Sequence, residues 1–335
     1  MHQSIFVFEF ITGGGLAGAP LPPSLTREGA MMRDALLRDA LELPNSEVIL
    51  LHDVRCPPPR PGATTITVAD AASFNAAFDH ALVRCDRALL VAPETGDVLA
   101  SLAARVERAG RGLLGCDAES SRIAASKSAT AERLRASGIA VIPHYRDAGT
   151  LPALPGAWAV KPDDGAGCEG LLKLADHVAA RAALQAAGPG AIAQPWLDGE
   201  ACSMNLLCAR GRAAVLSVNR QRLQAGDGGH IKLAALDVGA IAPTPAHVAL
   251  ASRIAATLPG LLGPVGVDFI ESGDGPVVVE INPRMSTSAC ALRDGLGLNL
   301  IAATLDALEH GTLPSLDGSG AREIVLQLET GKETG

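Results

Sequence analysis

Residues 277–284 (VVVEINPR) follow a second apolar run at 264–270 (PVGVDFI), and a short glycine-containing turn separates the two runs. Two apolar runs joined in this way predict a β-hairpin. Glu280 and Asn282 stand two residues apart, so their side chains point to the same face of the predicted strand. Asp268 on the partner strand can face both of them. The hairpin is therefore expected to gather three oxygen-bearing side chains in one place.

These three side chains suit a magnesium ion, which binds carboxylates together with the phosphates of a substrate. Mn²⁺ would accept the same ligands. The alternative is a solvent-exposed strand face that carries ordinary acids. We favour a metal site held by Asp268, Glu280 and Asn282, because both acids interrupt apolar strands, where an isolated charge is costly. Arg284 then supplies a cation for a phosphoryl group in transfer.

Two lysines precede the hairpin in the chain. Lys127 opens a predicted helix at 126–137, and Lys161 ends an apolar strand directly before the glycine-rich loop 163–170 (DDGAGCEG). A lysine in such a place acts as a point charge for phosphate, and the glycines let the backbone approach phosphates closely. Taken alone, each lysine is an ordinary surface residue and the loop an ordinary turn. Their order ahead of the acidic hairpin indicates a nucleotide phosphate site, although the loop is neither a P-loop nor a dinucleotide fingerprint.

Residues 1–115 alternate between short apolar strands and amphipathic helices, which predicts a parallel α/β sheet. The predicted strands there are 4–11, 47–51 and 88–92, and the predicted helices are 29–43 and 97–109. Further along, the pattern predicts strands at 157–161, 191–197, 202–208, 213–219 and 322–328, and helices at 176–187, 245–258 and 298–309. A polar stretch with Arg220, Arg222 and Lys232 lies between the central strands and the hairpin.

The overall composition narrows the classes of function. The net charge of −8 argues against a nucleic-acid or anionic-membrane partner, since both attract basic surfaces. The seven cysteines form no CxxC pair, which fits reduced thiols in the cytoplasm. Neither a signal peptide nor an apolar run of about 18 residues is evident. We therefore expect a cytoplasmic enzyme without a membrane segment.

The order of these features resembles the ATP-grasp superfamily over roughly residues 115–310, and the acidic hairpin is the most specific part of the resemblance. In that family ATP lies between two α+β lobes. The resemblance implies an α/β protein with an N-terminal parallel pre-ATP-grasp domain at 1–115. A central ATP-grasp lobe would follow at 116–200, and a C-terminal lobe with the metal site at 201–335.

The same resemblance assigns roles to individual residues. Lys127 and Lys161 would contact the phosphates and the adenine side, while Gly165, Gly167 and Gly170 would cover the phosphates. Gln194, Pro195, Trp196 and Leu197 would form the linker against which adenine packs, and Glu200 would accept the ribose hydroxyls. Asp268, Glu280 and Asn282 would hold Mg²⁺, with Arg284 near the γ-phosphate.

An enzyme of this family would transfer the γ-phosphate of ATP to a carboxylate, and an amine would then displace phosphate from the acyl phosphate. Arg220, Arg222 and Lys232 are candidates for neutralising the phosphoryl group or the acceptor carboxylate, although a surface role is as plausible for each. Ser286 and Ser288 follow Arg284 in the chain and are candidates for lining the substrate pocket.

A finer resemblance lies in three N-terminal stretches, 9–15 (EFITGGG), 24–32 (SLTREGAMM) and 92–95 (APET). They are similar to a subgroup of ATP-grasp ligases that join L-glutamate to tyramine in the biosynthesis of methanofuran-type cofactors, with tyrosine as an alternative amine. In that subgroup Glu9 and Glu28 would bind the amine. The alternative for these stretches is a purely structural strand–helix unit with a glycine turn.

Three functions stay open on the sequence alone. The first is an ADP-forming ligase acting on a small amino acid and an amine, either those named above or another amino acid or peptide. The second is a small-molecule kinase of the same fold, and the third is a non-catalytic nucleotide sensor. The intact set of lysines, acids and arginine disfavours the sensor. A homodimer is expected from the family.

Overall fold

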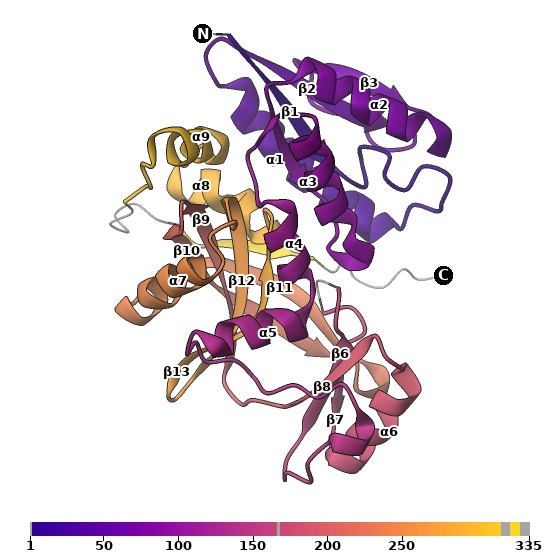
Figure 1. The fold of residues 1–335 in the computed structure, drawn as a ribbon, viewed down its shortest axis with the longest axis vertical. Coiled ribbons are helices and arrows are strands. Elements are labelled where there is room, and N and C mark those ends of the chain that lie inside the picture. The colour runs from indigo at the N-terminus through magenta and orange to yellow at the C-terminus, as the bar shows by residue number, and fades with distance from the viewer. Residues whose placement is uncertain (1, 166–167, 316–321, 329–335) are drawn as a thin grey trace.

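The structure is a computed structural model that describes residues 2–165, 168–315 and 322–328. Its strands form three sheets, each from one continuous part of the chain (Figure 1). The first has five strands in the order β3-β2-β1-β4-β5, and the second has three in the order β7-β6-β8. The third has six in the order β13-β12-β9-β10-β11-β14. The predicted α/β class is confirmed, with one parallel sheet and two antiparallel sheets.

All strand pairs of the five-stranded sheet are parallel, as the alternation predicts. Its strands are β1 (Gln3–Glu9), β2 (Ser46–Asp53), β3 (Thr64–Val68), β4 (Arg87–Val91) and β5 (Gly112–Leu113). Its helices are α1 (Pro23–Leu41), α2 (Ala71–Arg84) and α3 (Val98–Arg108). The sequence did not predict β3, because its threonines alternate with a half-buried isoleucine at the edge of the sheet and form no apolar run.

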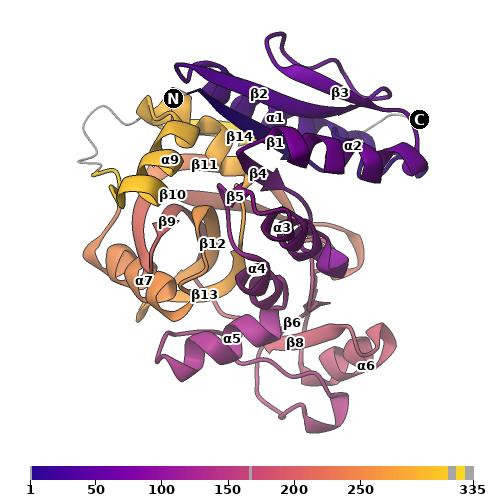
Figure 2. The same cartoon turned by 45° about the horizontal axis from the view of Figure 1, so that its top comes forward.

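One hydrophobic core joins the N-terminal sheet to the C-terminal part of the chain. Ile5 and Val7 on one face of β1 pack with α1, and the same core contains Leu207 of β9 and Ile301 of α9 (Leu300–His310). Figures 1 and 2 both show α1 beside α9. The opposite face of the sheet packs on α2 and α3 through a separate core rich in phenylalanine. The shared core fixes the N-terminal sheet relative to the six-stranded sheet.

The predicted hairpin is confirmed at the edge of the six-stranded sheet. The strands of this sheet are β9 (Glu200–Ala209), β10 (Arg212–Ala225), β11 (Ile231–Ile241), β12 (Gly263–Ser272), β13 (Gly275–Asn282) and β14 (Ile324–Gln327). β12 and β13 pair antiparallel, and β12 also pairs with β9. Helix α7 (Pro245–Thr257) covers one face of the sheet and packs on the residues of β9, β12 and β13 that point to it.

The structure corrects the prediction for the polar stretch between the central strands and the hairpin. β10 continues to Ala225, so Arg220 and Arg222 are strand residues, and Lys232 lies in β11, which was not predicted. Polar side chains occur in this part of β10 because its final residues are largely exposed. A prediction based on apolar runs alone therefore ends β10 too early.

The three-stranded sheet forms a small lobe of its own. Its strands are β6 (Trp158–Pro162), β7 (Leu172–Leu174) and β8 (Ala191–Pro195), covered by α6 (His177–Ala187). Trp158 is fully buried in a core whose described members all belong to this lobe. Helices α4 (Ala118–Ala125) and α5 (Lys127–Ala136) lie between this lobe and the N-terminal sheet and pack against β13. The domain boundaries at 115 and 200 stay predictions.

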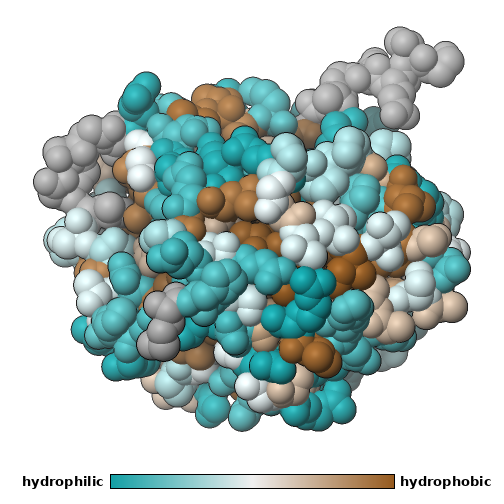
Figure 3. Space-filling model, turned by 90° about the horizontal axis from the view of Figure 1, so that it is seen from above, coloured by the Kyte–Doolittle hydropathy of each residue, from teal (hydrophilic) through white to brown (hydrophobic). Residues whose placement is uncertain are grey.

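The surface seen from above the N-terminal domain is mainly hydrophilic, and its hydrophobic residues lie in small separate groups (Figure 3). Among the described residues, each helix is too short or too polar to cross a membrane.

The start of β12 requires glycine. Gly263 has φ +67°, and a Cβ atom there would lie 2.5 Å from the carbonyl oxygen of Leu114. We expect Gly263→Ala to lower the free energy of unfolding by about 2–3 kcal/mol, since a left-handed alanine and a backbone contact are both unfavourable. Gly190→Ala is the control, because a Cβ at Gly190 meets no atom within 4 Å. Urea denaturation measures both, and equal midpoints would contradict the expectation.

Candidate active site

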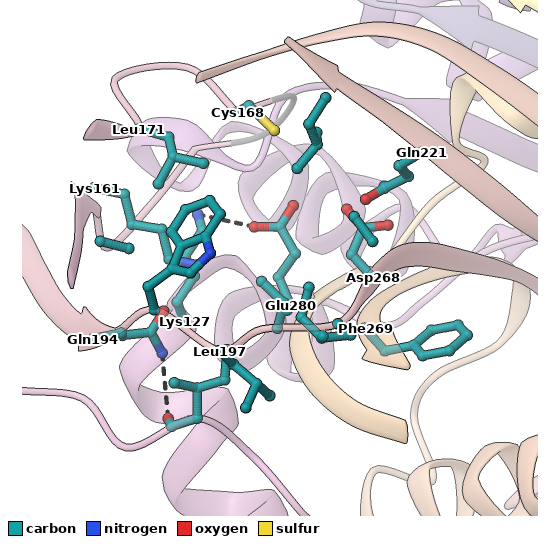
Figure 4. A pocket seen from close by; sticks show the side chains of 18 of the residues that line it. Lys127, Lys161, Cys168, Leu171, Gln194, Leu197, Gln221, Asp268, Phe269 and Glu280 are labelled. Carbon is teal, nitrogen blue, oxygen red and sulfur yellow. Dashed lines mark hydrogen bonds and ion pairs between the residues drawn. The ribbon is translucent and has the colours of Figure 1, made fainter. Parts of the chain in front are cut away.

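A cleft with about 1010 Å³ of space not filled by atoms lies between the three-stranded and six-stranded sheets. Its lining combines apolar side chains with a few charged and polar groups, as small-molecule sites do. Nine predicted site residues line it: Lys127, Lys161, Gly165, Gln194, Pro195, Trp196, Leu197, Asp268 and Glu280. Figure 4 shows the lysines and the acids pointing toward one another across the cleft. The structure thus brings together residues from α5, β6, β8, β12 and β13.

The acidic end of the cleft is formed by Asp268 and Glu280, which are partners in the β12–β13 ladder. Burial raises the pKa of Asp268 well above its ordinary value, and the neighbouring charge of Glu280 raises that pKa further. A buried carboxylate beside a second acid, such as Asp268, is stabilised in its charged form by a nearby cation. The pair is therefore expected to hold either a proton or a cation.

This donor set fits Mg²⁺. The described residues contain no group of three or more His, Cys, Asp or Glu side chains that could hold a metal ion. The protein would thus supply Asp268 and Glu280, and phosphate and water would complete the shell, as Mg²⁺ prefers. Asn282 pairs with Gly266, two positions along the same ladder, and lies buried just outside the cleft lining. Its role as a third ligand stays a prediction.

Lys127 and Lys161 lie in the cleft next to the acid pair, and each is less than one-tenth exposed. Lys127 Nζ lies 2.6 Å from the carbonyl oxygen of Gly165 and 3.4 Å from Glu280 Oε2. Burial lowers the pKa of Lys161 to about 8, although the charge of Glu280 opposes this shift. Both ammonium groups are therefore held close to the acid pair, where a bound triphosphate would meet them.

The position of Lys127 follows from the cap of its helix. Ser126 caps α5 by accepting from the backbone N–H of Ala129. Asp163, at the base of the glycine-rich loop, accepts hydrogen bonds from the backbone N–H and hydroxyl of Ser128 and from the hydroxyl of Ser126. The start of α5 is thus tied to the end of β6, so Lys127 and Lys161 are fixed relative to each other.

The part of the cleft away from these charged side chains is mainly apolar. Leu197 lies there with Ile142 and Phe269, and the Gln194 amide donates to the carbonyl of Ile142 over 3.3 Å. The ammonium of Lys173 lies 4.2 Å from the centre of the Trp196 ring. An apolar slot with an aromatic wall suits a flat base such as adenine, in agreement with the predicted role of this linker.

The structure places Arg220 away from the cleft. Successive side chains on a strand point to opposite faces, and Arg220 contacts Glu200, a residue predicted for ribose binding. Arg222 pairs with Asp237 at 2.8 Å. Lys232 lies exposed in β11, also outside the cleft lining. These cations and Glu200 thus lie outside the cleft lining, and their catalytic and ribose-binding roles stay predictions.

Gln221 of β10, which lines the cleft next to Leu223, is a site residue that the sequence pattern did not predict. Its side chain lines the cleft and is hydrogen-bonded to Asp268, which moderates the rise in the pKa of that carboxyl. Extending β10 by strand alternation from Asn219 would have placed it correctly. Of the predicted glycines, Gly165 lines the cleft and Gly170 does not, while Gly167 lies outside the described residues.

Arg284 lies in a second polar cluster, where the N-terminal domain meets the loop after β13. It pairs with Glu94, which follows β4, and Glu28 of α1 contacts Thr287 of this loop. Ser286 and Ser288 both donate to the buried amide oxygen of Asn205, over 2.9 and 3.1 Å.

The Glu9 carboxylate is hydrogen-bonded to the loop that directly follows it. Its carboxylate accepts from the backbone N–H of Ile11 and from the backbone N–H and hydroxyl of Thr12 at 2.7–3.0 Å. The Glu9 carboxylate is therefore engaged within the protein, and its binding of an amine stays a prediction.

Buried lysines facing an acid pair, with an apolar slot beside them, define a site for a nucleoside triphosphate and its phosphoryl chemistry. Comparison with known proteins agrees. Residues 124–288 match a family model described as an ATP-grasp domain, and residues 46–120 match a pre-ATP-grasp domain. The chain belongs to the ATP-grasp superfamily.

Individual relatives support the same class. The chain is 27% identical over 296 residues to tyramine–L-glutamate ligase from Methanocaldococcus jannaschii, covering 87% of this chain and 85% of the relative. An ATP-grasp superfamily protein from Archaeoglobus fulgidus superposes with a TM-score of 0.71 at 22% identity, covering 97% and 92% of the two chains. The L-amino acid ligase from Bacillus licheniformis gives a TM-score of 0.61 at 15% identity, covering 91% and 74%. The predicted ATP-grasp fold is confirmed, and the relatives of named activity are ligases, in agreement with the predicted class, an ADP-forming ATP-grasp ligase.

The low pKa of Lys161 gives nucleotide binding a distinct pH dependence. With a pKa of about 8, the ammonium is charged below pH 8 and loses its proton above it. Bound phosphates favour the charged form. Affinity for Mg-ATP should therefore be level below pH 8 and fall by up to about tenfold per pH unit above it. Calorimetric titration between about pH 7 and 9.5 measures this.

Lys161→Arg is the matched control, because arginine stays charged throughout this range. Its affinity should vary less with pH than that of the wild type. A level profile for the wild-type protein would show that Lys161 is not the group that binds phosphate.

Proposed function

We propose that the protein joins the carboxylate of an amino acid to an amine through an acyl phosphate and releases ADP and phosphate. The observation that carries this proposal is the convergence of Lys127 and Lys161 with Asp268 and Glu280 in one cleft. Phosphoryl transfer requires positioned cations around the transferring group and little covalent chemistry from the protein. The cleft supplies that arrangement.

L-Glutamate and tyramine are the substrates we propose first, with tyrosine as the alternative amine. Their support is the similarity to the M. jannaschii tyramine–L-glutamate ligase over most of both chains. Identity of 27% supports the class of reaction more strongly than the choice of amine. The proposed setting is the biosynthesis of a methanofuran-type cofactor.

The residues of the cleft would have separate roles. Lys127 and Lys161 would hold the phosphates of ATP and balance charge on them, and the apolar slot beside Trp196 would orient the base. Asp268 and Glu280 would hold Mg²⁺, which, when bound, neutralises charge on the phosphoryl oxygens. Gln221 would keep the Asp268 carboxylate oriented toward the cleft.

The second polar cluster would receive the acceptors. Arg284 offers a planar cation for a carboxylate or an acyl phosphate. Glu28 and Glu94 bring negative charge to the same region, which suits the ammonium group of an amino acid or an amine. Ser286 and Ser288 would line this space.

The proposal is tested by ADP release and product mass with glutamate and a panel of amines. Release should depend on both the acid and the amine, and the product should have the mass of their amide. ATP turnover without an amine, with a stably phosphorylated product, would identify a kinase instead. Turnover of another amino acid or a peptide would retain the ligase and correct its substrate.

The acid pair provides a direct test of the chemistry. We expect Glu280→Gln to lower kcat by about 10²–10³-fold, because it removes a charge that would hold the metal in the transition state. The fold should be unchanged, since glutamine has the same shape. Steady-state ADP release and circular dichroism measure the two effects.

Glu271→Gln is the matched control on the same hairpin. Glu271 lies in β12, where it pairs with His247 at 2.9 Å and stays outside the cleft lining. Its variant should keep nearly all activity. Near-normal turnover by Glu280→Gln would contradict the assignment of Glu280 as a metal ligand. Equal losses of activity in both variants would indicate general damage to the hairpin.

A further inference from the structure

The loop after β4 brings a buried acid from the N-terminal domain to the ATP-grasp domain. Glu94 is 4% exposed and stands at the carboxyl end of a strand in the parallel sheet. This is the edge where open parallel sheets bind ligands. Its two oxygens lie 2.9 Å from Arg284 Nε and 3.1 Å from Arg284 Nη2. A single side chain thus spans the contact between the two domains.

The contact fixes the guanidinium from two sides. Arg284 Nη1 donates to the carbonyl oxygen of Met285 over 3.1 Å, and Nη2 donates to Glu94 Oε2 over 3.1 Å. Nε lies at ion-pair distance, 2.9 Å, from Glu94 Oε1. Met285 belongs to the core that joins the two domains, so the backbone of this loop is anchored as well. The guanidinium has donors left on Nη1 and Nη2, and their direction is set by the pairing with Glu94.

The same loop also reaches the nucleotide side. The backbone N–H of Gly96 donates to Asp164 Oδ2 over 3.1 Å. Asp164 lies at the base of the glycine-rich loop and forms a β-bridge with Ser126, the residue that caps the helix of Lys127. Gly96 and Asp97 have φ of +65° and +61°, so the turn that presents this N–H has an uncommon backbone shape.

We infer that Glu94 is a positioning residue that acts through Arg284 and makes the N-terminal domain part of the active site. The inference rests on the proposed function, in which Arg284 contacts the acyl group or the phosphate that it carries. Glu94 itself need not contact substrate. Its carboxylate aims the guanidinium, and its loop sets the distance between that guanidinium and the lysine side of the cleft.

If the Glu94–Arg284 pair had only a structural role, its removal would affect stability and not kcat in particular. Removing one partner of a buried pair destabilises a protein wherever the pair lies, but it would not change kcat selectively. A positioning role predicts a loss in kcat with nucleotide affinity retained, since Glu94 is outside the cleft lining. It also predicts that the loss disappears when Arg284 is already absent.

The test is a double-mutant cycle with Glu94→Gln and Arg284→Gln. We expect Glu94→Gln to lower kcat by about 30–100-fold, with the Kd for Mg-ATP within about twofold of wild type. The double variant should be no slower than Arg284→Gln alone, within about twofold. Glu94→Asp keeps the charge and should recover part of kcat. Calorimetric nucleotide binding gives a reading that does not require turnover.

Asp97→Asn is the matched control in the same loop. Asp97 makes an exposed ion pair with Arg122, and asparagine tolerates the same backbone shape. This variant should stay within about twofold of wild type in kcat. Additive losses in the cycle, a parallel loss of nucleotide affinity, or unchanged kcat in Glu94→Gln would each overturn the inference.

Failure of the proposed function gives a different pattern. If the wild-type protein shows no ADP release that depends on an acid and an amine, the ligase proposal fails. The same cycle is then measured on basal ATP hydrolysis. Coupling of Glu94 and Arg284 there would uphold the positioning role, and additivity would reject it.

Discussion

Two lysines and two carboxylates share one cleft that is largely removed from solvent. An isolated charge in such a place is costly, so each of the four needs the others or a ligand of complementary charge. Lys127 and Lys161 come from α5 and β6, while Asp268 and Glu280 come from β12 and β13. The charges are balanced only while these elements stay together. Much of the remaining architecture can be understood as the means of holding them there.

The two sides of the cleft are held by different means. The acids lie on a hairpin at the edge of a six-stranded sheet, where β9 and the helix α7 support β12. The lysines depend on polar contacts, with Asp163 joining the start of α5 to the end of β6. The acid side is therefore the more rigid one, as a site that holds a metal requires. Arg284 gains its position from a third source, the N-terminal domain through Glu94.

The parts of this site that could be predicted are those set by local pattern. Charged residues interrupting apolar strands identified Asp268 and Glu280, and the glycine-rich loop after an apolar strand identified Lys161. Neither the partner of Arg284 nor the face of Gln221 could be found in this way. Glu94 is distant from Arg284 in the chain, and only the packing of two domains brings them together. The direction of Gln221 depends on where β10 ends, and its exposed polar residues concealed that end.

The three sheets differ in how much hydrophobic core supports them. The N-terminal sheet and the six-stranded sheet share one large core, which contains Met285 from the loop after Arg284. The three-stranded lobe has a small core around Trp158, and the described residues of this core all lie outside the other two sheets. Local opening is cheapest where the fewest apolar contacts must be broken. The half of the cleft that carries Lys161 is therefore expected to exchange its amide hydrogens first, while the surroundings of Arg284 persist as an assembled platform. A nucleotide would then act as the clamp that completes the enzyme, and an acceptor would meet a surface already formed before that nucleotide arrives.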